Sequence, residues 1–339
     1  MLNKAVIDLR VLKENATAVK GLLPNSTKLC AVVKADAYGH GAEECANALY
    51  KIADCFAVAL VEEGIKLRLS GIDNEILVLS PVYPFDLENL VRYNLTATIF
   101  SLEDAILLCH QAKRQGKRAR AHVKFNCGMN RQGIDTTTEL ENIFKEFSGD
   151  KWLDICGMYG HLSNPQNKNS LKREQNKFLL ANNCVKRYNN KAICHLSSSG
   201  GVIEGAFFDM VRVGILLYGY TPYKTDAIDV KPIMKIYAPI IRERNLKKGD
   251  SALYGTCRAK ADQKINLVRY GYADGLFRRA TIGQFNNRCM DVTAVTDIKK
   301  ENGFFVVLSS AKDLADKYGT ISYEILVKSA VRAEKIYLR

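Results

Sequence analysis

The sequence has little of what marks disordered, fibrous or membrane-spanning proteins. Among 339 residues only 7 are proline and 23 are glycine, too few for a fibrous or linker-rich chain. Hydrophobic residues make up 47% of the chain, which is too many for intrinsic disorder. No window of roughly eighteen uncharged apolar residues occurs, so no transmembrane helix is expected. The N-terminal segment carries charges every few positions and has no apolar core, so we expect no secretory signal and a cytoplasmic protein.

Paired cysteine motifs are also missing. The chain has 10 cysteines, but no two stand as CxxC, and no Cys and His cluster has zinc-finger spacing. We therefore expect no metal site. The pattern is typical of a reduced cytosolic protein that uses cysteine as a small core residue. Several cysteines lie inside apolar runs, namely Cys30, Cys55, Cys156 and Cys194.

Acidic residues are too few to balance the basic ones. There are 49 Lys and Arg against 36 Asp and Glu, a net charge of +13, which at first suggests a nucleic-acid partner. The basic residues are dispersed, however, and the densest stretch, 113–118, lies between an apolar helix pattern and an apolar strand. We interpret it as a helix end and a solvated loop. We therefore expect no nucleic-acid partner, and note that excess positive charge suits a small anionic ligand.

Short apolar runs rich in β-branched residues recur along the first two-thirds of the chain. Helix-like patterns such as 42–51 and 102–115 separate them, and this alternation predicts parallel βαβ units. Near-continuous apolar strands fit a sheet that is covered on both faces. Eight units favour a (β/α)8 TIM-like barrel, with a doubly wound open sheet as the alternative. The runs are 30–34, 55–60, 76–80, 96–100, 120–125, 156–161, 192–197 and 210–214.

The pattern changes after about residue 225. Strand-like segments now follow one another with little helix between them. We therefore predict an α/β barrel over 1–225 and a smaller all-β domain over 226–339. A further strand-like run at 5–10 precedes the barrel strands and is a candidate member of the second domain. The strand-like segments are 235–243, 265–272, 290–296, 304–310 and 321–330.

Polar groups follow five of the predicted barrel strands. In (β/α)8 barrels the catalytic groups stand at the carboxyl ends of the strands, so these groups are expected to converge on one mouth. They are Lys34 after the first strand, Lys124 and Arg131 with the fifth, His161 with the sixth, Ser199 after the seventh, and Arg212, Gly214 and Ile215 with the eighth.

A lysine at the end of an apolar strand is unusual, because lysine is rarely buried without a partner. Near other cations Lys34 would have a lowered pKa and act as an amine nucleophile toward an aldehyde. A lysine that extends to solvent is the alternative interpretation. Ser199, the pair Gly200 and Gly201, and Gly214 offer a hydroxyl and backbone N–H groups that suit a phosphate. An aldehyde that carries a phosphate is pyridoxal 5'-phosphate (PLP), which we predict as the cofactor.

The segment VVKADAYGHG at 32–41 resembles the PLP-lysine signature of the alanine racemase family. The resemblance continues in the same order along nearly the whole chain. It implies interconversion of L-alanine and D-alanine, with D-alanine supplied for peptidoglycan. The further matching segments are HVKFNCGMNRQG at 122–133, DMVRVGILLYG at 209–219, GYADGLFRR at 271–279, CMDVTAV at 289–295 and ISYEIL at 321–326.

The resemblance implies a role for each matching residue. Lys34 would bind the cofactor and serve as one base, and Tyr254 would be the base on the opposite face. Arg212 would face the pyridine nitrogen, His161 would lie beside the cofactor, and Lys124 matches a lysine that is often carbamylated. The implied phosphate-binding positions are Tyr38, Ser199, Gly214, Ile215 and Tyr323, and the implied substrate-binding positions are Arg131, Met290 and Asp291.

Two bases on opposite faces are what racemisation needs, because a proton leaves one face of Cα and another returns to the other. Nearby cations must lower the pKa of Tyr254 if it is to act at neutral pH. Racemisation of serine or of a basic amino acid is an alternative, and a related PLP decarboxylase is another. Tyr323 would crowd a larger side chain and so favours alanine. In the family the tyrosine base comes from a second subunit, which implies a head-to-tail homodimer with shared sites.

Overall fold

The computed structural model describes residues 2–254, 258–275, 277–278, 288–296 and 300–339. Residues 276 and 279 of the motif at 271–279 therefore lie outside the described residues. The chain divides into two compact units, which we describe separately. The barrel unit holds Leu12–Ala35 and Ala42–Val230, and the sheet unit holds Met1–Val11, Asp36–Gly41 and Lys231–Arg339.

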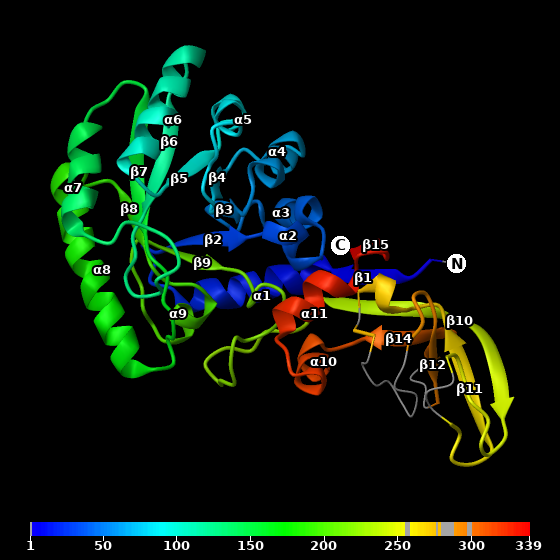
Figure 1. Cartoon of the computed structure of the whole chain (residues 1–339). Helices are drawn as coiled ribbons and strands as arrows, with labels where there is room; N and C mark the ends of the chain where they lie inside the picture. The colour runs from blue at the N-terminus through cyan, green and yellow to red at the C-terminus, as the bar shows by residue number, and fades with distance from the viewer. Residues whose placement is uncertain (1, 255–257, 276, 279–287, 297–299) are drawn as a thin grey trace. The chain divides into compact units, whose positions relative to one another are not determined.

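Eight parallel strands form the centre of the barrel unit (Figure 1). Their order is β8-β7-β6-β5-β4-β3-β2-β9, so neighbours in sequence are neighbours in the sheet except where β9 joins β2. The strands are β2 (Lys28–Val32), β3 (Cys55–Val58), β4 (Glu75–Val78), β5 (Thr96–Ile99), β6 (Ala119–Lys124), β7 (Leu153–Tyr159), β8 (Ile193–His195) and β9 (Met210–Val213).

Backbone hydrogen bonds also join the two ends of this strand order. The Asp209 N–H donates to the Cys194 carbonyl at 3.0 Å, and the Arg212 N–H donates to the Ser197 carbonyl at 2.9 Å. The strands therefore form a nearly closed barrel rather than an open sheet, as the sequence predicted. Every side chain of β3 and of β5 is buried, in keeping with a sheet covered on both faces.

Helices connect these strands and lie outside them, as α6, α7 and α8 show beside β6, β7 and β8 (Figure 1). In α6 the buried residues Ala105, Leu108 and Ala112 share one face, Ser101 caps the first turn, and Gly116 ends the helix with φ of 61°. The helices are α1 (Leu9–Leu22), α3 (Ala42–Leu49), α4 (Val61–Leu69), α5 (Leu87–Arg92), α6 (Leu102–Gln115), α7 (Thr137–Glu146), α8 (Lys168–Tyr188) and α9 (Ser199–Ile203).

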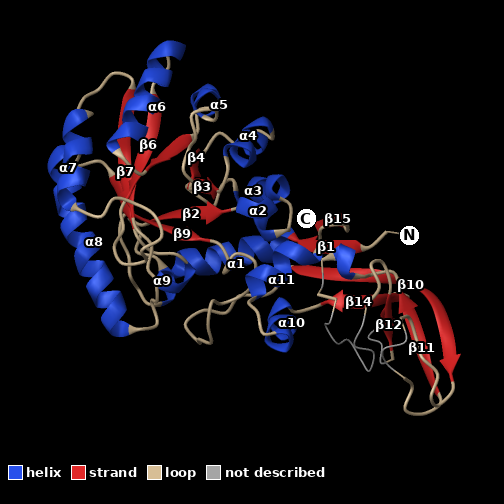
Figure 2. Cartoon of the chain, viewed as in Figure 1, coloured by secondary structure: helices blue, strands red, loops and turns tan. Residues whose placement is uncertain are grey.

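The sheet unit is built on a mixed sheet with the order β12-β11-β10-β1-β15, and β14 pairs with β10 and β13 (Figure 2). The run at 5–10 contributes β1 to this sheet, antiparallel to β10 and parallel to β15. The elements are β1 (Lys4–Asp8), β10 (Met234–Leu246), β11 (Gln263–Val268), η1 (Tyr272–Asp274), β12 (Thr293–Val295), β13 (Lys300–Glu301), β14 (Phe304–Leu308), α10 (Ala311–Tyr318), α11 (Ser322–Ser329) and β15 (Glu334–Leu338).

The strand predicted over 321–330 is wrong, because this segment forms the helix α11. Ile325 and Ser329 are buried one helical turn apart. Glu324 and Lys328 form an ion pair at the same spacing, with 2.5 Å between Oε1 and Nζ. A short apolar run does not distinguish a strand from a buried helix by its periodicity, and the i, i+4 pairs were the signal that decides it.

Among the described residues, no helix has both the length and the apolar character that crossing a bilayer requires.

Candidate active site

The predicted site residues of the barrel unit stand at the carboxyl ends of its strands. In a closed parallel barrel these ends meet at one mouth, which is where barrel enzymes place their chemistry. Lys34 comes two residues after β2, Lys124 ends β6, His161 comes two residues after β7, Ser199 begins α9 after β8, and Arg212 lies within β9.

Four cationic side chains gather around His161. Burial and the charges of Arg212, Lys124, Arg131 and Lys34 together hold the pKa of His161 well below its usual value of 6.5. The imidazole is therefore neutral at physiological pH. A buried cluster of positive groups is a favourable place for a small anion, because the low dielectric strengthens each attraction.

Lys34 is half-buried, and burial together with the charge of Arg131 lowers the pKa of its amine, while Glu63 opposes the shift. Glu63 is held in place by the backbone around it. Its Oε1 accepts a hydrogen bond from the Ala35 N–H at 2.6 Å, and its Oε2 accepts one from the Ala59 N–H at 2.7 Å. A lowered pKa increases the fraction of neutral, nucleophilic amine at neutral pH.

Lys124 is almost fully buried, with 6% of its surface exposed. Burial and the charges of Arg212 and Arg131 lower the pKa of its amine to about 7. Its Nζ lies 4.4 Å from the centroid of the Tyr159 ring, which offers a partial counter-charge. Lys124 is therefore poised between its charged and neutral forms at physiological pH.

Arg212 is a buried guanidinium that forms no ion pair with a carboxylate in the described part of the chain. Its Nη1 donates to His195 Nδ1 at 2.7 Å and to the His195 carbonyl at 3.1 Å. Its Nη2 donates to the carbonyls of Gly160 at 2.6 Å and Leu196 at 3.2 Å, and lies 3.4 Å from His161 Nδ1. The positive charge of Arg212 is thus oriented but not neutralised.

The predicted phosphate-binding residues of the barrel unit are buried around the start of α9. Ser199 is 4% exposed and Ile215 1% exposed, and Gly214 is also buried. Ser198, at the N-cap of α9, makes no side-chain hydrogen bond to the helix. The side chain at the N-cap therefore leaves the first N–H groups of α9 uncapped, and helix starts of this kind bind phosphate.

The segment that follows Lys34 has a strained backbone. In α2 (Lys34–Tyr38) the four residues from Ala35 to Tyr38 all have φ between 51° and 55°, so the turn is left-handed. For L-amino acids this conformation costs roughly 1–2 kcal/mol per residue. Strain of this kind persists where the surrounding structure enforces it, and it concentrates at functional sites.

Other predicted residues lie in the sheet unit. Tyr38 and Tyr323 are neighbours there, with ring centroids 5.9 Å apart. Burial raises the pKa of Tyr323 to about 12 and that of Tyr38 still further, so both hydroxyls keep their protons and can donate to an anion.

Tyr254, Met290 and Asp291 are exposed parts of the sheet unit. Tyr254 is 67% exposed and Met290 53% exposed. The hydroxyl of Tyr254 hydrogen-bonds the thiol of Cys289, which places the tyrosine beside Met290. Asp291 Oδ1 pairs with Arg332 Nη1 at 2.7 Å. The structure thus brings these residues, distant in sequence, to one exposed region.

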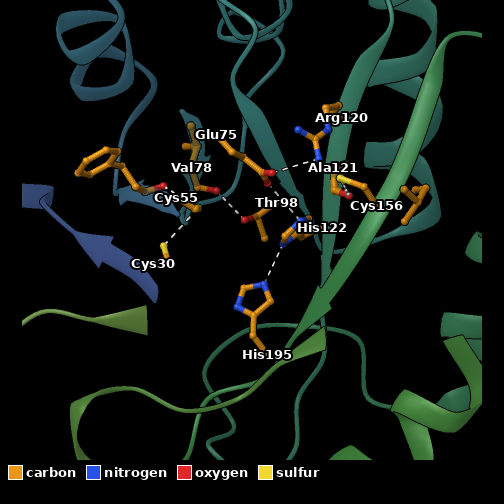
Figure 3. Close-up of polar contacts among 12 residues, drawn as sticks. Cys30, Cys55, Glu75, Val78, Thr98, Arg120, Ala121, His122, Cys156 and His195 are labelled. Atoms are coloured by element: carbon orange, nitrogen blue, oxygen red, sulfur yellow. Dashed lines mark hydrogen bonds and ion pairs between the residues drawn. The ribbon is translucent and has the colours of Figure 1, made fainter. Parts of the chain in front are cut away.

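Sequence reasoning missed two residues behind the site, the buried His122 and the half-buried Glu75, and did not place His195 in the site. His195 accepts a hydrogen bond from Arg212. Figure 3 shows that His195 also contacts His122, which in turn faces Glu75. The sequence held a signal for His122 but none for its contact with Glu75. Arg120 and His122 alternate with Lys124 along β6, so the strand period of two directs both to the same side as the predicted site residue Lys124.

Fold and site together define a (β/α)8-barrel protein with a cluster of basic side chains that suits a small anionic molecule. The model for "Alanine racemase, N-terminal domain" matches residues 7–222, and that for "Alanine racemase, C-terminal domain" matches residues 233–337. The chain belongs to the alanine racemase family, which is PLP-dependent, so the cofactor predicted from the sequence is confirmed.

Individual related proteins also indicate the alanine racemase family. An alanine racemase of Thermodesulfovibrio yellowstonii is 32% identical over 363 residues, covering 99% of this chain and 97% of that protein. An amino-acid racemase of Enterococcus faecalis is 31% identical over 357 residues, and the match covers 96% of this chain but only 50% of that longer protein.

Solved structures agree in fold. An alanine racemase of Clostridium difficile 630 has a TM-score of 0.93 at 30% identity, covering 100% of this chain and 96% of that one. An alanine racemase of Bartonella henselae with covalently bound pyridoxal phosphate has a TM-score of 0.87 and covers 100% of both chains. Its identity of 24% supports likeness of fold alone.

Proposed function

We propose that this protein is an alanine racemase that interconverts L-alanine and D-alanine with two bases, Lys34 and Tyr254, and supplies D-alanine for peptidoglycan. The observation that carries the proposal is the cluster of Lys34, Lys124, Arg131 and Arg212 around a neutral His161. The amine of Lys34 suits an aldehyde, and its cationic neighbours suit the anionic groups of PLP and of an amino-acid substrate.

When bound, PLP supplies an electron sink that makes the Cα proton of the amino acid acidic. The chain supplies the rest. Lys34 takes or returns the proton on one face of Cα, and its lowered pKa makes the neutral amine available as a base. Tyr254 serves the opposite face. Arg131 binds the substrate carboxylate, and Met290 and Asp291 line the substrate side.

Arg212 faces the ring nitrogen of the cofactor in this proposal. A guanidinium only donates hydrogen bonds and keeps its proton, so it offers no proton to the ring. An Asp or Glu at this place would stabilise a protonated ring, which favours decarboxylation and transamination. In the described part of the chain Arg212 contacts imidazoles and carbonyls instead, and this favours racemisation over the decarboxylase alternative.

The phosphate of the cofactor binds to Ser199, Gly214, Ile215, Tyr38 and Tyr323. The protonated hydroxyls of Tyr38 and Tyr323 and the uncapped start of α9 support these assignments. Lys124 carries a carbamyl group in this proposal. Its pKa of about 7 supports the assignment, because only a neutral amine reacts with carbon dioxide.

The active protein is a homodimer in which Tyr254, Met290 and Asp291 of one subunit complete the site of the other. The exposure of Tyr254 and Met290 supports this, since large apolar surfaces on a single subunit mark contact sites. The nine described cysteines are all free thiols, which supports a cytoplasmic location.

The function is tested by comparing racemisation rates of L-alanine, L-serine and L-lysine with purified protein and added PLP. Alanine should give the highest kcat/KM. Faster racemisation of serine or lysine would support the alternative substrates, and release of carbon dioxide at comparable rates would support a decarboxylase. Borohydride treatment followed by peptide mapping should find the cofactor on Lys34, and modification of another lysine would contradict the site.

A further inference from the structure

Behind Arg212 a chain of polar side chains crosses the interior of the barrel unit. His195 on β8 accepts from Arg212, His195 Nε2 lies 2.8 Å from His122 Nδ1, and His122 Nε2 lies 3.4 Å from Glu75 Oε1. At its far end Glu75 Oε2 pairs with Arg120 Nη2 at 3.0 Å. Figure 3 shows His195, His122 and Glu75 one after another. Of these residues, the proposed function assigns a role only to Arg212.

The guanidinium of Arg212 determines where every hydrogen in this chain lies. It is only a donor, so His195 Nδ1 must be an acceptor and a neutral His195 carries its hydrogen on Nε2. That hydrogen points at His122 Nδ1, which must accept in turn. A neutral His122 then carries its hydrogen on Nε2, which lies 3.4 Å from Glu75 Oε1 but without the geometry of a hydrogen bond. One arrangement of hydrogens satisfies both hydrogen bonds, and the contact of His122 with Glu75 is electrostatic.

Both imidazoles are neutral at physiological pH. Burial lowers the pKa of His122 to about 4, assisted by Arg120 and Arg212 and opposed by Glu75 and Asp154. Burial, Arg212, His122 and Lys124 hold the pKa of His195 well below its usual value. The chain therefore joins one permanent positive charge to one carboxylate through two neutral rings.

The local structure keeps space for this arrangement. A Cβ atom on Gly157 of β7 would lie 2.6 Å from His122 Nε2, so only glycine admits the ring at this position. The pairing of β6 with β7 shifts register between Ala121 and His122, which places Cys156 in an irregularity beside the ring. His195 is also stacked on Tyr159, with ring centroids 5.1 Å apart.

We propose that Glu75 and His122 are positioning residues for Arg212. Through His195 they fix the acceptor that meets Nη1, and so they hold the guanidinium in the plane that it presents to the cofactor ring nitrogen. This inference rests on the proposed function, which places Arg212 at that nitrogen. Without His122 the hydrogen on His195 Nε2 loses its acceptor, and His195 is free to adopt the tautomer that directs a hydrogen at Arg212. Without Glu75 no carboxylate faces the hydrogen on His122 Nε2, so the orientation of the His122 ring is less well fixed.

A metal ion is the competing occupant of this region. The ligand atoms of Glu75, His122 and Cys156 all lie within 4.8 Å of one another. Three observations oppose a metal here. His122 Nε2 carries a hydrogen in the arrangement above, Arg120 already pairs with Glu75, and burial raises the pKa of Cys156 to about 12, which keeps its thiol protonated.

The first test is independent of activity. The full chain, loaded with PLP and labelled with 15N-histidine, has five histidines whose ring nitrogens are resolved by NMR. We expect His122 and His195 both to carry hydrogen on Nε2 alone. In His122→Leu the His195 signals should shift toward a mixture of tautomers. In His122→Asn they should stay as in the wild type, because the amide oxygen replaces Nδ1 as acceptor.

The second test separates kcat from KM. We expect His122→Leu and Glu75→Gln to lower kcat for alanine roughly tenfold while KM stays within about twofold, as is usual when a supporting partner of a site residue is removed. His122→Asn should recover most of kcat. Asp154→Asn is the matched control, because Asp154 lies near His122 but belongs to no hydrogen bond of the chain, and it should leave both constants unchanged.

Three results would overturn the inference: hydrogen on His195 Nδ1 in the wild type, equal kinetics for His122→Leu and Asp154→Asn, or one zinc ion per chain that is lost in Cys156→Ser. The Glu75→Gln variant covers the case in which His122→Leu does not fold. Failure of the proposed function would be recognised separately. In that case the wild type does not racemise alanine, while the NMR experiment still decides whether the chain of hydrogens exists.

Discussion

Lys34 combines a reactive amine with a neighbourhood that no ordinary surface lysine has. It follows a buried strand, its pKa is lowered by burial and Arg131, and the strained turn of α2 begins with it. Each of these features costs stability, so their coincidence at one residue indicates function. The proposed roles of Lys34 and Tyr254 can be tested directly by substituting each residue.

Lys34→Ala should remove both the covalent attachment of PLP and the activity, because no other group supplies an amine on that face. We expect kcat/KM to fall by at least about a thousandfold. The absorbance band of the attached cofactor should disappear from the spectrum of the purified protein. Lys28→Ala, at the exposed start of β2, is the control and should keep both. Retained activity in Lys34→Ala would exclude it as a base.

Tyr254→Phe should keep the cofactor attached but lower the racemisation rate by roughly a hundredfold or more, since one of two proton-transfer groups is lost. Loss of solvent deuterium incorporation should be greater starting from one enantiomer than from the other. Tyr83→Phe removes a similarly exposed hydroxyl and serves as the control. Full activity of Tyr254→Phe in both directions would refute the two-base proposal.

The pKa of Lys124 predicts a pH dependence of stability. Its amine titrates at about 7 in the folded chain and near 10.5 in the unfolded one, so between these values the unfolded state binds more protons. Its contribution to stability therefore improves as pH rises, by up to about 1.4 kcal/mol per pH unit. Lys124→Met should be more stable than the wild type at pH 6, with the advantage shrinking toward pH 10.

This comparison is made by urea denaturation of the cofactor-free protein in buffers free of carbon dioxide, so that carbamylation does not contribute. A constant difference in the free energy of unfolding across this range would show that Lys124 titrates normally.

At the scale of residues, matching of sequence motifs predicted which side chains belong to the site but not which residues contact them. The cluster of Lys34, Lys124, Arg131 and Arg212 was expected, because all four stand at strand ends of one barrel. The contacts behind Arg212 were not expected, since His122 and Glu75 come together only in the closed barrel. Their distances in sequence carry no sign of this contact.

At the scale of elements, glycine is required for two different reasons, namely space for a neighbouring side chain and a positive φ angle. Gly157 of β7 leaves room for the His122 ring, whereas Gly116 ends α6 with φ of 61° and has open space around it. We expect Gly157→Ala to destabilise the fold by about 1–3 kcal/mol through overpacking and to lower activity. Gly116→Ala should cost about 1 kcal/mol through backbone strain and leave kcat unchanged.

Urea denaturation and alanine kinetics measure both effects. If both variants lost activity equally, the contact with His122 would not be the cause.

Barrel strands were predictable because each is a short, fully apolar, β-branched run between helical patterns. Helix α11 was not, because its sequence is equally rich in apolar residues and its buried face appears only when its i, i+4 contacts are known. The left-handed turn of α2 was also hidden, since Ala35, Asp36 and Ala37 are ordinary residues that the fold forces into that conformation.

At the scale of the whole molecule, the proposed shared sites predict complementation. Lys34→Ala and Tyr254→Phe should each be nearly inactive alone. After mixing, unfolding and refolding together, about a quarter of wild-type activity should return, because half of the dimers pair the two variants and each has one intact site. Each variant refolded alone is the control. No recovery in the mixture would mean that each subunit uses its own tyrosine.

The position of β1 has a consequence for how the chain is made. Lys4 pairs with Tyr237 on one side and with Glu334 on the other, so β1 is synthesised long before either of the strands that it pairs with. Until those strands are made, the apolar side chains of β1 that are buried in the folded protein have no sheet to pack in. The growing chain is therefore vulnerable to aggregation through β1, and dependent on chaperones, until β10 and β15 have both been made.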